Sequence, residues 1–349
     1  MKYSDNMGRR AAIGKIGSGI LALSIIGSPD RSAGQTQDRP VNPVKEYPKP
    51  PFKSQSQPWP GLCSEMEPRP DHGEDSYKGS GRLQGRKALI TGGDSGMGRA
   101  AAIAYAREGA DVAINYLPEE EKDAKEVIAL IKAAGRKAVA IPGDLRKEEF
   151  CIRLIEDAVL QLGGLDILVS NAARQQTKPS ILDITTAEFD ATMKTNIYAP
   201  FWLIKAALPH LKPGAVIIGT TSVQAADPSE DLYDYAQTKA ATTNYIRSLA
   251  KQLGPKGIRV NGVAPGPIWT ALQVSGGATQ EKLVNFGGDT PGATRRTCFN
   301  LCAIGCGRRK LCERTNLWGR GRRWTALKIS DYSMTKKIPF KGIFLSSIS

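Results

Sequence analysis

The sequence lacks three features, each of which would indicate a particular kind of partner. Its six cysteines form no C-x2-C pair, and such pairs are what make a zinc site recognisable, so no metal site is predicted. No apolar run reaches the roughly 20 residues of a membrane-spanning helix, which excludes a permanent span. Neither a basic helix nor an aromatic platform accompanies the net charge of +14, so nucleic acid is not an expected partner.

Most of the positive charge lies at the C-terminal end of the chain. From residue 292 onward, 13 Lys and Arg stand against two acidic residues, Glu313 and Asp331, and this segment therefore holds +11 of the +14. Four of the six cysteines also lie there. The preceding residues have an ordinary globular composition and are numerous enough for one sizeable α/β domain.

The N-terminus begins with a twin arginine, Arg9-Arg10, followed by a small and apolar run over residues 11–27. This arrangement resembles a twin-arginine export signal, here spanning residues 1–34. It predicts an exported or periplasmic protein. The alternative is an extension without a targeting role, in which case the protein is expected in the cytoplasm.

Residues 35–82 are dense in proline, with nine prolines between Arg39 and Gly81. Proline removes backbone donors and interrupts helices and central strands, so this segment is predicted to be an extended arm. Tyr47, Phe52 and Trp59 give it apolar side chains. They would allow the arm to lie against the folded body.

From Arg86 onward, short apolar runs alternate with amphipathic stretches, a pattern typical of repeated βαβ units. The expected strands are residues 88–91, 111–115, 138–141, 165–170, 215–219 and 258–263. The expected helices are residues 97–108, 119–134, 148–162, 187–208 and 233–253. The predicted fold class is a single α/β domain with a Rossmann-type, doubly wound parallel sheet.

A glycine turn follows the first expected strand and has the form T-G-x-x-x-G-x-G, with Gly92, Gly96 and Gly98. Such a turn allows backbone N–H groups and a helix dipole to hold a pyrophosphate. The pattern is typical of the short-chain dehydrogenase/reductase family, which residues 83–291 resemble. Together with its arm, the chain resembles the N-terminally extended bacterial branch of that family, with its general-stress-protein-like and glucose-dehydrogenase-like members.

The resemblance implies a catalytic set and a cofactor site. The catalytic residues would be Asn196, Ser222, Tyr235 and Lys239, with Ser222 thirteen residues before the tyrosine. Tyr233 is a nearby alternative, but only Tyr235 has a lysine four residues later. The cofactor-binding residues implied are Gly92, Asp94, Ser95, Gly96, Met97, Gly98, Asn115, Tyr116, Asp144, Leu145, Asn171, Ala172, Ala173, Tyr235, Lys239, Pro265, Gly266, Ile268 and Thr270. The segment Ser170-Asn171-Ala172-Ala173 resembles the family's N-N-A-G segment and departs from it at Ser170 and Ala173.

The chemistry of hydride transfer requires a proton donor. Adding hydride to a carbonyl leaves negative charge on oxygen, and tyrosine alone, with a pKa of about 10, is a weak acid-base group near neutral pH. Lys239, one helical turn beyond Tyr235, would favour tyrosinate and lower the pKa of the phenol. Ser222 would donate a hydrogen bond to the substrate oxygen. The predicted function is interconversion of an alcohol with an aldehyde or ketone; the alternatives are an inactive remnant and a non-catalytic nucleotide-binding scaffold.

The second expected strand ends in Asn115-Tyr116, where a site specific for NAD usually has Asp or Glu for the ribose 2′-hydroxyl. Because that acid is missing, NADP is favoured over NAD. The expected partner is a small alcohol or carbonyl compound, recognised by the segment from Gln273 to Asn285 and by the C-terminus. An intact family member would also be expected to form a homotetramer.

The resemblance stops after Pro291. Read in the frame displaced by one base, residues 303–326 are compatible with a peptide that resembles the family's usual C-terminus, Q-L-A-A-A-D-A-S-Y-A-N-G-Q-I-Y-G-A-A-G-G-G-G-Q-P. We therefore interpret residues 292–349 as a frameshift product, in the gene or in its sequencing. The family's last strand would then be missing, and with it one usual subunit interface.

Overall fold

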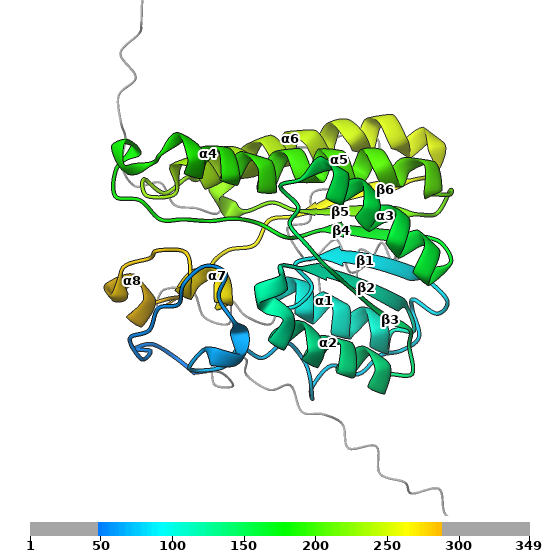
Figure 1. Cartoon of the computed structure of the whole chain (residues 1–349), viewed down its shortest axis with the longest axis horizontal. Coiled ribbons are helices and arrows are strands. Elements are labelled where there is room, and N and C mark those ends of the chain that lie inside the picture. Colours follow the sequence, from blue (N-terminus) through cyan, green and yellow to red (C-terminus); the bar gives the residue numbers. More distant parts are fainter. Residues whose placement is uncertain (1–47, 288–349) are drawn as a thin grey trace, which may run out of the picture. The chain divides into compact units, whose positions relative to one another are not determined.

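The computed structural model describes residues 48–287, in which a six-stranded parallel sheet forms the centre (Figure 1). The strand order is β3-β2-β1-β4-β5-β6. The strands are β1 (Lys87–Thr91), β2 (Asp111–Tyr116), β3 (Ala138–Pro142), β4 (Ile167–Ser170), β5 (Val216–Thr220) and β6 (Arg259–Val263). The expected doubly wound parallel sheet is confirmed, and each expected strand lies within two residues of an observed one.

Helices cover both faces of this sheet. They are α1 (Gly96–Arg107), α2 (Glu121–Ala133), α3 (Glu148–Leu162), α4 (Thr186–Met193), α5 (Ala199–Ala207), α6 (Tyr233–Leu253), α7 (Ala271–Val274) and α8 (Gln280–Val284). In Figure 1, α1 and α2 lie on one side of the sheet and α3 to α6 on the other. This arrangement buries the central strands on both sides, which explains their nearly continuous apolar sequences.

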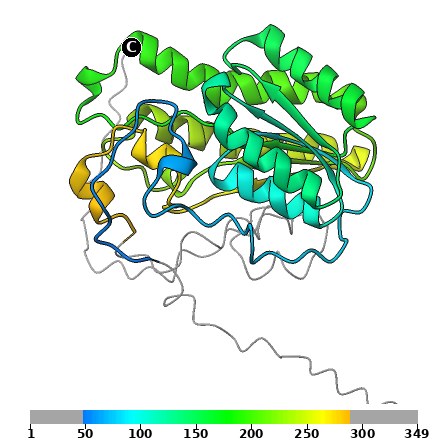
Figure 2. The ribbon, with the colours of Figure 1, turned by 60° about the horizontal axis from the view of Figure 1, so that its bottom comes forward.

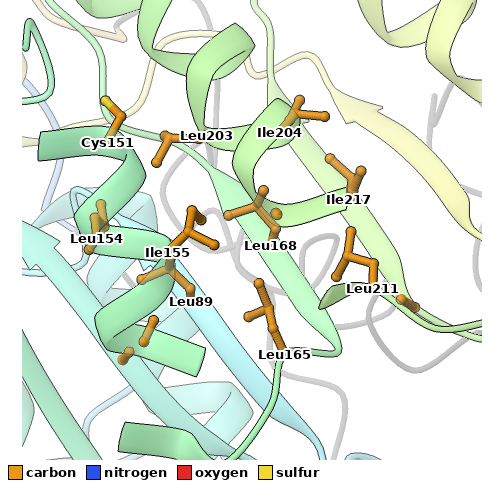
Figure 3. Close-up of a cluster of buried hydrophobic side chains, with 14 of the residues drawn as sticks. Leu89, Cys151, Leu154, Ile155, Leu165, Leu168, Leu203, Ile204, Leu211 and Ile217 are labelled. Atoms are coloured by element: carbon orange, nitrogen blue, oxygen red, sulfur yellow. The ribbon is translucent and has the colours of Figure 1, made fainter. Parts of the chain in front are cut away.

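Two apolar clusters fill the space between the sheet and its helices. One joins α1 and α2 to the sheet and contains Ala101, Tyr105, Val127 and Ile131 together with Ile90. The other joins α3, α5 and α6 to the opposite face. Figure 3 shows part of this second cluster, where side chains of α3 and α5 meet those of the sheet: Leu154, Ile155, Leu203, Ile204, Leu89, Leu168 and Ile217. Ile90 is aligned with Ile114 of β2 and Val169 of β4, so the register places apolar residues side by side.

The long helix expected over residues 187–208 is present as a continuous helical segment over residues 186–207, but a change of helix type in its middle was not expected. Residues Lys194–Tyr198 form a π-helical turn between α4 and α5. Pro200 follows at the start of α5. Because proline has no N–H, it cannot continue the regular hydrogen-bond ladder of an α-helix. The short helices α7 and α8 were also not expected.

The first part of the arm lies beside α7 and α8, the blue and gold segments of Figure 2, whereas its later residues bond to α1 through Arg99 and Arg107. Phe52 N–H donates to the carbonyl oxygen of Val284 (2.8 Å), and Gln57 N–H donates to that of Val274 (2.9 Å). The Phe52 and Trp269 rings have centroids 4.8 Å apart. The arm therefore packs together with the segment that contains Trp269, α7 and α8. Within it, Cys63, Met66, Trp269 and Leu283 are buried together.

Several predictions concern residues outside those described. They are the export signal over residues 1–34, the contact of Tyr47 and the frameshifted tail with its missing strand. Within residues 48–287, no helix has the length and apolarity needed to cross a bilayer. The same residues contain no group of three or more His, Cys, Asp or Glu side chains that could hold a metal ion.

Candidate active site

The turn between β1 and α1 brings glycine backbone into close contact with other segments. Gly92 and Gly96 have φ values of +60° and +51°, a conformation that favours glycine. A Cβ atom on Gly98 would lie 1.8 Å from the carbonyl oxygen of Gly92, so a side chain does not fit there. Ser95 precedes α1 and makes no side-chain capping hydrogen bond. The first N–H groups of α1 are thus left uncapped, as an anion-binding helix terminus requires.

Asn171 and Ala172, at the end of β4, are fixed against this turn. Thr91 Oγ1 accepts hydrogen bonds from the backbone N–H groups of Asn171 (3.0 Å) and Ala172 (3.1 Å). The Asn171 side chain donates to the carbonyl oxygens of Thr91 and Gly92 (both 3.3 Å). Thr220 Oγ1 donates to Asn171 Oδ1 (3.1 Å). One asparagine therefore connects the carboxyl ends of β1, β4 and β5.

These strand ends lie at the reversal point of the sheet. β1 pairs with β2 on one side and with β4 on the other, and open α/β sheets bind ligands at this position. The glycine turn leaves close backbone access and uncapped N–H groups at the same edge. The residues present therefore fit a dinucleotide.

Tyr235, Lys239 and Ser222 are brought together at the start of α6 and the end of β5. The ammonium group of Lys239 lies 5.2 Å from the centroid of the Tyr235 ring. It donates a hydrogen bond to the carbonyl oxygen of Thr220 (2.9 Å). Ser222 forms a side-chain hydrogen bond with Tyr235, and its Oγ also accepts from Gln224 N–H (3.2 Å). The three predicted side chains thus share one buried location.

The expected direction of the tyrosine pKa shift differs from that in the structure. Burial raises the pKa of Tyr235 to about 12, although the hydrogen bond with Ser222 acts in the opposite direction. Burial also lowers the pKa of Lys239 to about 8. Both shifts have the same physical cause, because desolvation disfavours a charged side chain. Desolvation of the phenol thus outweighs the hydrogen bond with Ser222.

Asn196 lies in the π-helical turn and is buried at 3% exposure. Its Oδ1 accepts from Arg174 N–H (2.8 Å). Its Nδ2 donates to the carbonyl oxygen of Arg174 (2.9 Å) and to Thr238 Oγ1 (3.0 Å). The side chain therefore links the loop after β4 to α6, one turn from Tyr235.

Two predicted cofactor residues at the end of β2 form hydrogen bonds with other residues of the protein. The Asn115 amide donates to the carbonyl oxygens of Ile141 (3.1 Å) and Gly143 (3.2 Å). The Tyr116 hydroxyl donates to Glu121 Oε2 (2.6 Å). These side chains fix β2 to β3 and to α2. They do not present free polar groups at the strand end.

Asp144 and Leu145 follow β3. The Asp144 carboxylate accepts from the Arg146 backbone N–H (2.9 Å) and forms an ion pair with its guanidinium (2.7 Å). Although burial opposes the shift, these hydrogen bonds lower the pKa of Asp144. The Leu145 side chain is part of the apolar core.

Asp94, within the glycine turn, is 1% exposed. Burial, together with the negative charge of Asp123, raises its pKa. Its charged neighbours include Asp123 and Arg99, so it faces the protein interior. Its binding of a cofactor stays a prediction.

The segment after β6 reaches the glycine turn. Thr270 Cγ2 would lie 3.1 Å from a Cβ atom placed on Gly96. Ile268 and Thr270 line a small pocket together with Gly96 and Met97. The Pro265 carbonyl oxygen accepts from Val223 N–H (3.0 Å), and Gly266 has open space beside it. This part of the predicted site is therefore assembled.

Sequence reasoning assigned no role to Thr220 or Arg174, and it treated Thr91 only as part of the glycine motif. Thr220 binds both Lys239 and Asn171, and Thr91 holds the loop after β4. The Arg174 backbone fixes Asn196. For Thr220 and Thr91, the only sequence signal is a threonine at the end of a central strand, because their partners are distant along the chain.

Comparison with known proteins places this geometry in a family. Residues 86–281 match the short chain dehydrogenase family. The chain belongs to this family. It is 58% identical to the oxidoreductase YghA of Escherichia coli strain K12 over 246 residues, which cover 70% of this chain and 82% of the relative. It is 49% identical to general stress protein 39 of Bacillus subtilis strain 168, with coverages of 71% and 86%. The predicted family and its general-stress-protein-like branch are confirmed.

A solved structure of the family is also similar to this chain. It is a short chain dehydrogenase from Burkholderia cenocepacia in complex with NADP. Its sequence identity is 35% and its TM-score is 0.58, over 64% of this chain and 89% of that chain. Together with the relatives, this similarity identifies the chain as an oxidoreductase of the short chain dehydrogenase family.

Proposed function

We propose that this protein interconverts an alcohol with an aldehyde or ketone, using Tyr235 as the acid-base residue. The observation that carries the proposal is the joint burial of Tyr235, Lys239 and Ser222 at the ends of the central strands, beside the glycine turn. When bound, a nicotinamide dinucleotide supplies the hydride for reduction and accepts it during oxidation.

The residues of this chain would handle the proton and the developing charge. In reduction, the Tyr235 hydroxyl donates its proton to the carbonyl oxygen as negative charge develops there. The Ser222 hydroxyl donates a hydrogen bond to the same oxygen. Burial lowers the pKa of Lys239 to about 8, so its charge can change near neutral pH. Lys239 would stabilise the tyrosinate left after proton transfer.

The glycine turn and the segment after β6 would hold the cofactor. Backbone N–H groups at the start of α1 would bind the pyrophosphate, and Thr270 lies near enough to Gly96 to close over it. We favour NADP, because Asn115 and Tyr116 place no carboxylate at the end of β2 and because the similar Burkholderia enzyme binds NADP. NAD is the alternative.

A cofactor-oxidation assay tests this function. The full-length protein is mixed with NADPH, or NADH, and a panel of aldehydes, ketones and sugars, and the loss of reduced-nicotinamide absorbance is followed. We expect turnover of at least one carbonyl compound, with faster turnover of NADPH. Unchanged absorbance across the panel, from a protein that binds the cofactor, would support a non-catalytic scaffold instead.

The N-terminus and C-terminus carry further proposals that are based on the sequence. Export through the twin-arginine route would deliver a folded enzyme with its cofactor already bound. Fusion of residues 1–34 to a reporter that is active only in the periplasm tests this route. For the tail, sequencing of several clones across codons 285–295 decides whether the frame is continuous. A corrected frame is expected to restore the family's tetramer, measured by light scattering.

A further inference from the structure

The N-terminal arm contributes a buried histidine to the region of the glycine turn. His72 is 4% exposed and lines a small pocket with Gly96 and Met97 at the start of α1. Ile268 and Thr270, from the segment after β6, complete the opposite side of this pocket. Three segments that are far apart in the sequence therefore meet where the first turn of α1 presents its N–H groups.

One nitrogen of the His72 ring has a partner and the other has none. Nδ1 lies 3.0 Å from Glu74 Oε1. Nε2 is buried and has no hydrogen-bond partner among residues 48–287. Buried polar atoms of this kind are rare and usually indicate a water, an ion or a ligand that completes them. His72 therefore brings to the pocket a ring that is held through one nitrogen and keeps one polar atom without a partner.

Glu74 holds this ring in place. It also accepts a hydrogen bond from the His72 backbone N–H (2.8 Å). Its carboxylate is paired with Arg99 of α1 (3.0 Å), whose side chain is 2% exposed. Burial opposes ionisation of Glu74, but the hydrogen bond from His72 and further bonds lower its pKa to about 2. The histidine is thus connected to the same helix whose first turn forms the glycine site.

The proton on the ring follows from this arrangement. Because the Glu74 carboxylate can only accept, Nδ1 must carry a hydrogen. An anion at Nε2 then requires a second hydrogen on that nitrogen. The ring would be an imidazolium between the Glu74 carboxylate and the anion. A charge-assisted hydrogen bond of this type is stronger than a neutral one.

We propose that His72 is a ligand of the dinucleotide pyrophosphate, contributed by the arm to a site that the Rossmann domain otherwise forms alone. This inference rests on the proposed dinucleotide-dependent function. The uncapped start of α1 binds the diphosphate from one side, and Nε2 of His72 donates to one of its oxygens from the other. The arm therefore has a role in cofactor affinity in addition to packing.

Binding measurements on the full-length protein test the role of His72. Titration calorimetry with NADPH, ADP and adenosine is compared between the wild type, His72→Gln and His210→Gln. His210, the other histidine of the chain, is exposed and lies beyond α5, so it serves as a matched control. We expect His72→Gln to weaken NADPH and ADP binding about tenfold and to leave adenosine binding unchanged, because adenosine has no diphosphate.

Imidazole nitrogen NMR gives a second readout that needs no variant. The chain has only two histidines, so the His72 signals can be assigned with His210→Gln. Saturating NADPH should convert Nε2 of His72 to a protonated, hydrogen-bonded nitrogen, and adenosine should not.

Three outcomes overturn the role of His72. They are unchanged NADPH affinity in His72→Gln, an equal loss of adenosine affinity, and an unchanged His72 spectrum at saturating NADPH. A wild-type protein that binds no dinucleotide would overturn the proposed function as well, so the two failures are distinguishable. If His72→Gln does not fold, the wild-type spectrum alone decides.

Discussion

The Asp123 carboxylate of α2 accepts hydrogen bonds from the backbone N–H groups of Cys63 (2.6 Å) and Ser64 (3.2 Å) of the arm. Asp123 is completely buried. A single acidic side chain thus satisfies the start of the arm's short helical turn, which has no side-chain cap of its own. The arm is therefore attached to the domain by a specific polar contact as well as by its apolar residues.

Replacing Asp123 should release this part of the arm. In Asp123→Ala the two N–H groups lose their acceptor, and loss of a buried hydrogen bond to a charged group costs about 1.5 to 3 kcal/mol. Removal of the charge also relieves repulsion of Asp94, so we expect a net loss of about 2 kcal/mol in the free energy of unfolding. Denaturant unfolding measures this loss, and limited trypsin digestion should cleave the arm faster.

The exposed residue Glu119, four positions earlier, provides the control. Glu119→Ala should leave both stability and proteolysis unchanged, because surface substitutions usually change stability little. Equal trypsin resistance of Asp123→Ala and the wild type would contradict an anchoring role for Asp123.

Glu108, at the end of α1, should make stability depend on acid pH. Its side chain is fully buried and accepts hydrogen bonds from Tyr77, from Ser80 N–H and from Arg82. Burial opposes the shift, but these bonds lower its pKa from 4.5 to about 2. The folded state therefore binds this proton less readily than the unfolded state does. The stabilisation is complete above pH 4.5 and disappears as the pH falls towards 2.

A shift of this size corresponds to roughly 3 kcal/mol at neutral pH. We expect Glu108→Gln to lose stability at pH 7 and to lose much of the pH dependence between 4.5 and 2. Urea unfolding at a series of pH values measures both effects, with Glu119→Gln as an exposed control. A wild type and Glu108→Gln with parallel stability curves over that range would show that Glu108 is not responsible.

The fold could be predicted from the sequence because its signals are local. Apolar strands and amphipathic helices have their own periodicities, and the bounds of α3 and α6 agree with the predicted residues 148–162 and 233–253. The helix predicted over residues 187–208 is also present, but its apolar pattern gave no sign of the π-helical turn at Lys194–Tyr198. Hydrophobic periodicity does not reveal which hydrogen-bond ladder a helix uses.

The sequence could predict which residues form the candidate site, but not how deeply they are buried or what surrounds them. The resemblance to the family implied that Ser222, Tyr235 and Lys239 would meet, as they do in the structure. The pKa of Tyr235 could not be predicted, because it depends on burial by residues from several elements. The same limit applies to the arm: contacts such as Cys63 with Asp123, which are 60 residues apart, have no local signal.

Tyr235→Phe tests the acid-base role in the proposed function. The variant keeps the ring but loses the hydroxyl, so NADPH affinity should be retained while proton donation is lost. General acid-base catalysis contributes about 10²- to 10⁴-fold, and we expect kcat/KM to fall by that factor. Steady-state kinetics on any carbonyl compound that the wild type reduces, together with NADPH titration, measures the two properties separately.

Tyr233 provides a matched control on the same helix. It is 44% exposed, so Tyr233→Phe should retain wild-type kcat/KM. A Tyr235→Phe variant with full activity would show that Tyr235 is not the acid-base residue. Loss of activity in Tyr233→Phe alone would assign that role to Tyr233.

Gly98→Ala should abolish dinucleotide binding by closing the glycine turn. Its added methyl group would lie 1.8 Å from the Gly92 carbonyl oxygen and 2.8 Å from Asn171 Nδ2. Neither neighbour can move freely, because Asn171 is bonded to Thr91, Gly92 and Thr220. Overpacking of this kind costs about 1 to 3 kcal/mol, so the melting temperature should fall as well. Gly254→Ala is the matched control, since an added Cβ there meets nothing within 4 Å. NADPH affinity in Gly98→Ala equal to that of Gly254→Ala would mean that the dinucleotide does not use this turn.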